Sequence, residues 1–143
     1  MSRVINPENA GRNRARLMQW IALACAEVMK AGSLRIDSDA LAFIVVALEE
    51  IAAGIDVSTA AWEKRDYWLK ADQFRRQWEW SGRSAQRLRG AIEGGNASEA
   101  IAALADLAPR LASVTLPKRL PKEMPWKGAH EKLTSGRKKT LES

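Results

Sequence analysis

The sequence from residue 38 to residue 62 reads SDALAFIVVALEEIAAGIDVSTAAW, and it decides the fold class of this chain. Its large apolar residues recur mostly at spacings of three and four, the period of an α-helix; they are Leu41, Ile44, Leu48, Ile51, Ile55 and Trp62. Phe43, Val45 and Val46 add apolar groups on the other faces. A helix that is apolar nearly all round is enclosed by its neighbours, so we expect this segment at the centre of a helical domain.

Three further segments of the chain show the same helical period. Asn6 and Pro7 are favoured residues for a helix start. Gly32 and the pair Gly94–Gly95 favour helix ends. Asp37 or Ser38 is a good cap for the segment that begins there, and Asn96 for the last one. The hydrophobic content also favours helices, because 24 residues are Ala and only 14 are Val or Ile. The sequence predicts helices near residues 7–31, 38–64, 67–93 and 97–113.

The arrangement of these helices follows from the short segments between them. Residues 32–36 and 94–95 allow only tight connections, which make neighbouring helices antiparallel. No Gly or Pro separates the second helix from the third, and we place that break near residues 64–68, where the apolar stripe changes direction. Pro109 is expected to kink the fourth helix or end it early. We therefore predict an all-α, antiparallel four-helix bundle. Its predicted buried residues are Ile44, Leu48, Ile51, Phe74, Trp78 and Leu104.

The positive charge is concentrated at the C-terminal end. The net charge is +6; residues 1–116 carry 15 basic and 14 acidic groups, whereas residues 117–143 carry eight and three. The second range also contains three prolines at four-residue spacing, which a helix interior does not accept. We predict a helical-bundle domain over 1–116 and a Pro-containing basic tail over 117–143, extended or partly disordered. Met124 and Trp126 are its apolar groups most able to anchor it.

The inventory of reactive residues argues against catalysis. One Cys and one His are too few for a disulfide framework or a multi-histidine metal site. Cys25 lies beside the apolar stripe of the first helix, where a small buried hydrophobe is expected, and His130 lies in the tail. The sequence contains neither a glycine-rich phosphate loop nor a Gly-x-Ser-x-Gly nucleophile turn. We expect no enzyme activity, no cofactor and no metal.

The sequence also favours a cytoplasmic location. Its longest uncharged apolar run, residues 40–48, is far shorter than the roughly 20 residues of a membrane-spanning helix. The N-terminal residues lack the apolar core of a secretory signal. We expect no membrane partner, and a reduced Cys25.

The third predicted helix interleaves aromatic and basic residues. Residues 64–89 carry eight basic and three acidic groups. Tyr67, Phe74 and Trp78 lie on its apolar stripe and are expected in the core, with Trp68 at the flank. Trp80 points about 200° away from Trp78 at 100° per residue. Three arginines share its direction: Arg76, Arg83 and Arg87.

Either another element of the chain covers this side of the helix, or the Trp80 ring is exposed among the arginines. We expect a partner chain, the C-terminal segment or a ligand to cover it, because an exposed tryptophan among arginines is typical of protein interfaces. We therefore expect a non-catalytic helical-bundle protein that binds a protein partner or itself through this Trp/Arg face. The alternative is a nucleic-acid-binding accessory subunit, whose third helix and tail stack on bases and neutralise phosphates. A third possibility is local stacking of arginines on the Trp80 ring. The interaction candidates are Trp80, Arg76, Arg83, Arg87, Trp68 and Trp126.

Overall fold

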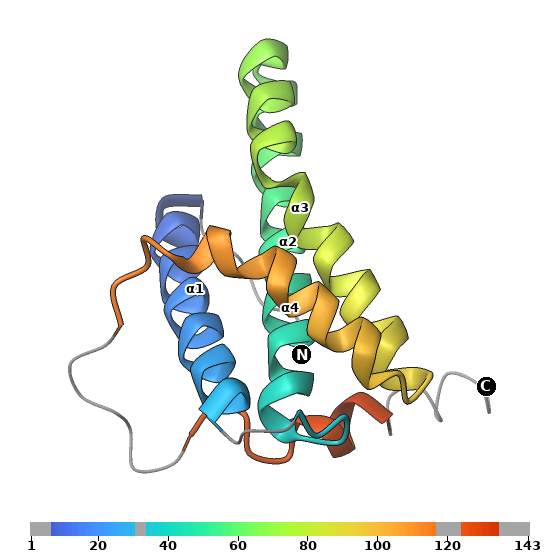
Figure 1. Ribbon diagram of the computed structural model, residues 1–143. Coiled ribbons are helices and arrows are strands. Elements are labelled where there is room, and N and C mark those ends of the chain that lie inside the picture. Colours follow the sequence, from blue (N-terminus) through green and yellow to red (C-terminus); the bar gives the residue numbers. More distant parts are fainter. Residues whose placement is uncertain (1–6, 31–33, 117–123, 135–143) are drawn as a thin grey trace.

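The computed structural model describes residues 7–30, 34–116 and 124–134, and over these ranges the chain is an all-α antiparallel bundle (Figure 1). Its four main helices confirm the predicted set to within two residues at each end. They are α1 (Pro7–Lys30), α2 (Asp39–Lys64), α3 (Trp68–Glu93) and α4 (Ala97–Leu111). Pro109 lies inside α4, which ends two residues later.

Two helix starts are fixed by the side chains that the sequence indicated. The hydroxyl of Ser38 accepts a hydrogen bond from the backbone N–H of Leu41 at 3.2 Å, and it caps α2. The side-chain oxygen of Asn96 accepts from the N–H of Glu99 at 3.1 Å, and it caps α4. Each cap satisfies a donor that has no partner within its own helix.

The break between α2 and α3 lies where it was predicted, although no glycine marks it. The N–H of Tyr67 donates to the carbonyl of Trp62 at 2.9 Å, and the N–H of Asp66 donates to that of Glu63 at 3.0 Å. This pair of bonds is the Schellman ending of a helix, whose turn residue adopts a left-handed conformation. Asp66 takes that role with φ 62°, which short polar side chains tolerate better than most.

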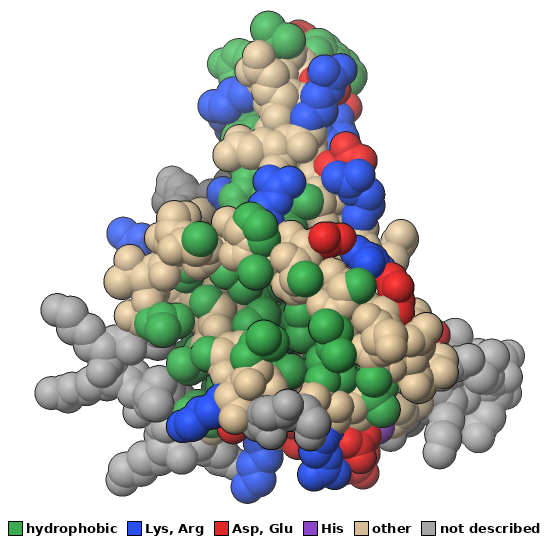
Figure 2. Space-filling view, viewed as in Figure 1, with side chains coloured by type: hydrophobic (Ala, Val, Ile, Leu, Met, Phe, Trp, Pro, Cys, Tyr) green, Lys and Arg blue, Asp and Glu red, His purple; other side chains and the backbone are tan. Residues whose placement is uncertain are grey.

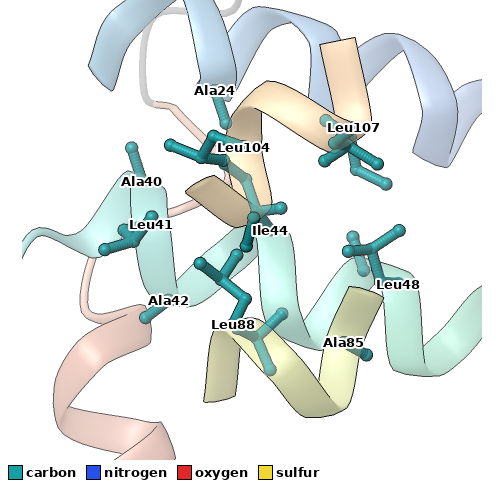
Figure 3. Packing of buried hydrophobic residues seen from close by; sticks show 14 of the residues in the cluster. Ala24, Ala40, Leu41, Ala42, Ile44, Leu48, Ala85, Leu88, Leu104 and Leu107 are labelled. Carbon is teal, nitrogen blue, oxygen red and sulfur yellow. The ribbon is translucent and has the colours of Figure 1, made fainter. Parts of the chain in front are cut away.

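The hydrophobic core lies where all four helices meet, and α2 runs through its centre (Figure 3). Ile44 and Leu48 of α2 are fully enclosed. They are surrounded by side chains of the other three helices, among them Ala24, Ala85, Leu88, Leu104 and Leu107. The predicted burial of Ile44, Leu48, Ile51 and Leu104 is confirmed.

Three aromatic residues of the predicted stripe are not fully buried in the core. Phe74 and Trp78 are only partly buried against the core, and Tyr67 is 53% exposed. The prediction that Tyr67 is buried is therefore wrong. The reason is the shape of the molecule: α2 and α3 extend as a two-helix hairpin beyond α1 and α4 (Figure 1). Among the described residues, no further helix covers the far end of this hairpin.

The described part of the predicted tail, residues 124–134, packs on the bundle and ends in a short helical stretch at 129–134. Trp126 is buried, and its ring lies 6.0 Å from that of Phe43 on α2. The carboxylate of Asp39 accepts from the backbone N–H groups of Gly128 at 2.9 Å and His130 at 3.1 Å. The predicted anchoring by Trp126 is confirmed. The basic cluster at 137–139 lies outside the described residues.

Candidate interaction surface

The aromatic residues of α3 stack with one another and with basic side chains of neighbouring helices. The guanidinium of Arg14, on α1, lies 5.0 Å from the ring centre of Phe74 and 5.1 Å from that of Trp78. Burial lowers the pKa of Arg14 from its ordinary value. Trp78 in turn lies 5.7 Å from Trp80. These aromatic rings of α3 therefore pack within the chain, against each other and against a guanidinium group from a neighbouring helix.

Trp80 is part of this internal packing and is only 8% exposed. The guanidinium of Arg110, near the end of α4, lies 5.2 Å from its ring centre. Of the two alternatives for this face, cover by another element of the same chain is the one observed. The prediction that a partner chain, the C-terminal segment or a ligand covers Trp80 is wrong, since α4 lies there. Trp80 does share a side of α3 with Arg83 and Arg87, and α4 occupies that side. Its ring nevertheless lies 5.7 Å from that of Trp78, so the two rings do not point apart as predicted. Local stacking of an arginine does occur, but the arginine comes from α4.

The three arginines assigned to the Trp/Arg face are each paired with carboxylates. Arg76 contacts Asp72 at 3.1 Å and Arg83 contacts Glu79 at 3.7 Å, both one turn apart on α3. Arg87 bridges to α4, where it donates to Glu99 at 2.5 Å and also pairs with Asp106. The hydrogen bond with Glu99 is the main cause that raises the pKa of Arg87.

Arg75 and Arg89 are paired as well, and both connect α3 to α2. Arg75 pairs with Glu63. Arg89 holds Glu49 by two hydrogen bonds at 2.8 and 3.0 Å, which raise the pKa of Arg89. The five arginines of α3 thus bind carboxylates of this chain, and this reduces their capacity to neutralise phosphates.

Exposed apolar side chains gather instead at the end of the α2–α3 hairpin. Tyr67, Trp68 and Leu69 are 53%, 60% and 71% exposed, and we call these three residues the aromatic tip. Figure 2 shows apolar groups at the projecting end of the molecule, with basic groups beside them. Such a cluster of large apolar side chains in water is typical of a contact surface.

Next to the aromatic tip, side chains of α2 and α3 pack against each other. Directly below it, the rings of Trp62 and Phe74 meet edge to face with centres 4.9 Å apart. The ammonium group of Lys70 lies 4.6 Å from the ring centre of Trp62. The Arg75–Glu63 pair also joins the two helices there. These contacts join α2 and α3 beneath the tip, and a preorganised backbone there reduces the entropy lost on binding.

The aromatic tip was only partly predicted. Trp68 was an interaction candidate and is exposed, whereas Tyr67 was assigned to the core and Leu69 was not considered. Trp126, another candidate, is buried against α2. A usable signal was present: the fourth helix is much shorter than the second and third, so it cannot cover their full length.

The described residues hold no cluster that points to metal or nucleophilic chemistry. Over these ranges no three His, Cys, Asp or Glu side chains converge as metal ligands would. Cys25 is half-buried, and burial raises the pKa of its thiol to about 12, so little reactive thiolate forms near neutral pH. Among the helices in the described ranges, none has the length and apolar character needed to cross a membrane.

Comparison with known proteins gives no family: no family model, no curated protein and no solved structure matches this chain.

Proposed function

We propose that this chain is a non-catalytic, cytoplasmic interaction protein that binds another protein, or a second copy of itself, through the N-terminal end of α3. The observation that supports it is the aromatic tip, where Tyr67, Trp68 and Leu69 are all more than half exposed. Trp and Tyr are enriched among the residues that dominate binding energy in protein interfaces. The binding site thus moves from the Trp/Arg face around Trp80 to the far end of the same hairpin.

The surroundings of the tip suit a protein partner. Lys64, Arg65 and Lys70 flank it and are exposed. A ring of polar or charged groups around an apolar centre is the usual anatomy of an interface, in which the apolar centre contributes affinity and the rim contributes orientation. In the nucleic-acid alternative, the arginines of α3 would neutralise phosphates. These arginines are paired with carboxylates of the same chain, so we favour a protein partner over nucleic acid.

Site-specific photo-crosslinking tests this proposal. A benzophenone amino acid replaces Leu69, which is 71% exposed, and the protein is irradiated in its native cells. We expect discrete protein–protein products. The matched control places the same group at Ala15, an exposed position on α1 outside the tip, and should give none of these products. Products with nucleic acid alone, or none at position 69, would refute the proposal.

A further inference from the structure

The aromatic tip lies in a stretch of the chain with an excess of positive charge. Residues 62–76, which include the tip, carry five basic and three acidic groups. Four of these groups pair with one another, as Glu63–Arg75 and Asp72–Arg76. The remaining four are Lys64, Arg65, Lys70 and Asp66. Three cations against one anion leave an excess of two positive charges around the tip.

The three cations beside the tip are accessible to a partner. Lys64, Arg65 and Lys70 are all exposed. Within the described ranges none of them forms an ion pair, in contrast to the arginines further along α3. Lys70 lies over the Trp62 ring, and this stacking leaves the ammonium group its charge. A partner that brings carboxylates to the tip therefore breaks no ion pair of this chain.

We propose that the partner of the aromatic tip is another protein, with an apolar recess bordered by Asp and Glu side chains. This inference rests on the proposed function of the tip and names the chemistry of its partner. The tip lies at the projecting end of the α2–α3 hairpin (Figure 1), so a surface that buries its three side chains must be recessed. Carboxylates around that recess face the three cations, and complementary charges of this kind speed association and fix orientation.

A second copy of this chain is a poorer partner for the tip. The chain has a net charge of +6, so two copies repel each other at low salt. Several of its carboxylates are also bound within the chain: Glu49 binds Arg89, and both Glu99 and Asp106 bind Arg87. The charges favour a different, acidic protein.

Two other negatively charged surfaces fit the tip less well. An anionic membrane attracts exposed aromatic and basic side chains, but Asp66 is exposed at the turn of the hairpin. Insertion of the tip would move this carboxylate towards the hydrocarbon, which is costly, whereas a recess in a protein can offer it a hydrogen-bond donor. Single-stranded nucleic acid is held in positively charged grooves, and the tip is a projection.

Charge reversal with a matched control tests the inference. The tip variant carries Lys64→Glu and Arg65→Glu. The control carries Lys30→Glu and Lys132→Glu, at exposed positions in α1 and in the C-terminal segment. Both variants have the same net charge, because each replaces two cations by two anions. The parent protein and both variants carry the benzophenone amino acid at position 69, and each is irradiated in a membrane-free, nuclease-treated extract of the native cells.

We expect the parent and the control to capture the same protein, joined through a peptide with Asp or Glu beside large apolar residues. The tip variant should capture it about tenfold less, because its new carboxylates face those of the partner. The yield of the parent should fall as NaCl rises from about 50 mM to about 500 mM, since salt screens exposed charges. The salt series needs no charge substitution, so it tests the inference even if a variant misfolds.

Four results would overturn the acidic partner. They are a yield from the parent that does not change with salt, equal yields from a folded tip variant and the control, capture of a second copy of this chain, and a product that forms only when nuclease is omitted. If no protein is captured, co-sedimentation with phosphatidylserine vesicles that the tip variant loses and the control keeps would identify a membrane surface instead.

Failure of this inference is distinguishable from failure of the proposed function. If position 69 captures another protein with a yield that neither salt nor charge reversal changes, the tip binds that protein through its apolar side chains alone, and only the present inference fails. If position 69 captures no protein, both fail.

Discussion

Replacement of Trp80 by Ala distinguishes internal packing from an external binding face. The ring is 8% exposed and is packed between Trp78 of α3 and Arg110 of α4. Its loss should therefore lower the free energy of unfolding and leave association through the tip unchanged. An exposed interface residue would show the opposite pattern.

The size of the effect can be worked out from the surroundings of the ring. Truncation of a buried Phe or Trp to Ala typically costs about 3–5 kcal/mol. Trp80 borders an open hollow of about 340 Å³ between α3 and α4, which water can enter to fill the space left by the ring. This places the expected loss in the lower part of the range, at about 3–4 kcal/mol. The contact with the exposed Arg110 accounts for about 0.5–1 kcal/mol of it.

Urea unfolding followed by far-UV circular dichroism measures this loss without relying on tryptophan fluorescence. The matched control is Trp68→Ala, the same substitution on the same helix at a position that is 60% exposed. It should change stability by no more than about 0.5 kcal/mol, as surface substitutions do. The slope of the transition should stay constant, since both variants expose similar surface on unfolding.

The result that would refute this reasoning is specific. A loss below about 1 kcal/mol for Trp80→Ala falls outside the cost of a buried aromatic ring, and it would mean that α4 does not cover the ring in solution. A larger loss for Trp68→Ala than for Trp80→Ala would mean that the assignments of tip and core are reversed.

Three further outcomes are expected. Asp66→Gly should leave stability unchanged or slightly higher in urea unfolding, whereas Asp66→Val should lower it by about 1–2 kcal/mol, because Asp66 has a φ of 62°; equal effects would contradict the assigned turn. Trp126→Ala should accelerate amide hydrogen exchange over residues 124–134 and leave α3 protected, because the ring anchors that segment to Phe43; unchanged exchange would show that the anchor lies elsewhere. Burial raises the pKa of the Cys25 thiol from 9.0 to about 12, so the folded state holds this proton longer than the unfolded state and loses stability as the pH rises above about 9. Iodoacetamide at pH 8, followed by mass spectrometry, should accordingly modify Cys25 much more slowly in the folded protein than in urea, and equal rates would contradict the burial.

The helix boundaries could be predicted because local chemistry determines them. Ser38 and Asn96 cap helices through hydrogen bonds to residues three positions ahead, and a sequence displays such pairs directly. The break near Asp66 was predictable only from the change in direction of the apolar stripe. Its left-handed turn residue was not, because glycine is the usual residue there.

The misassignment of Tyr67 has a different cause. A stripe shows which face of a helix is apolar, but not how far along its length a neighbour extends. Here α4 has 15 residues against 26 in each of α2 and α3, so at 1.5 Å per residue it spans about 22 Å of their roughly 39 Å. α1 has 24 residues, yet α2 and α3 extend beyond it as well (Figure 1). Helix length and the position of each helix along the hairpin together decide which part of the stripe the described residues cover.

The case of Trp80 shows why a Trp/Arg face is ambiguous in a sequence. α3 packs against α2 on one side and against α4 on another, so two of its faces are buried. The main apolar stripe in the sequence marks only one of these faces. An aromatic ring among arginines serves a contact within the chain as well as one between chains. The feature that identifies the contact as internal lies on α4. Glu99 and Asp106 stand seven residues apart, on one face of α4, and both bind Arg87. A matching pair of carboxylates in the same chain therefore favours an internal contact, and the aromatic tip has no such counterpart among the described residues.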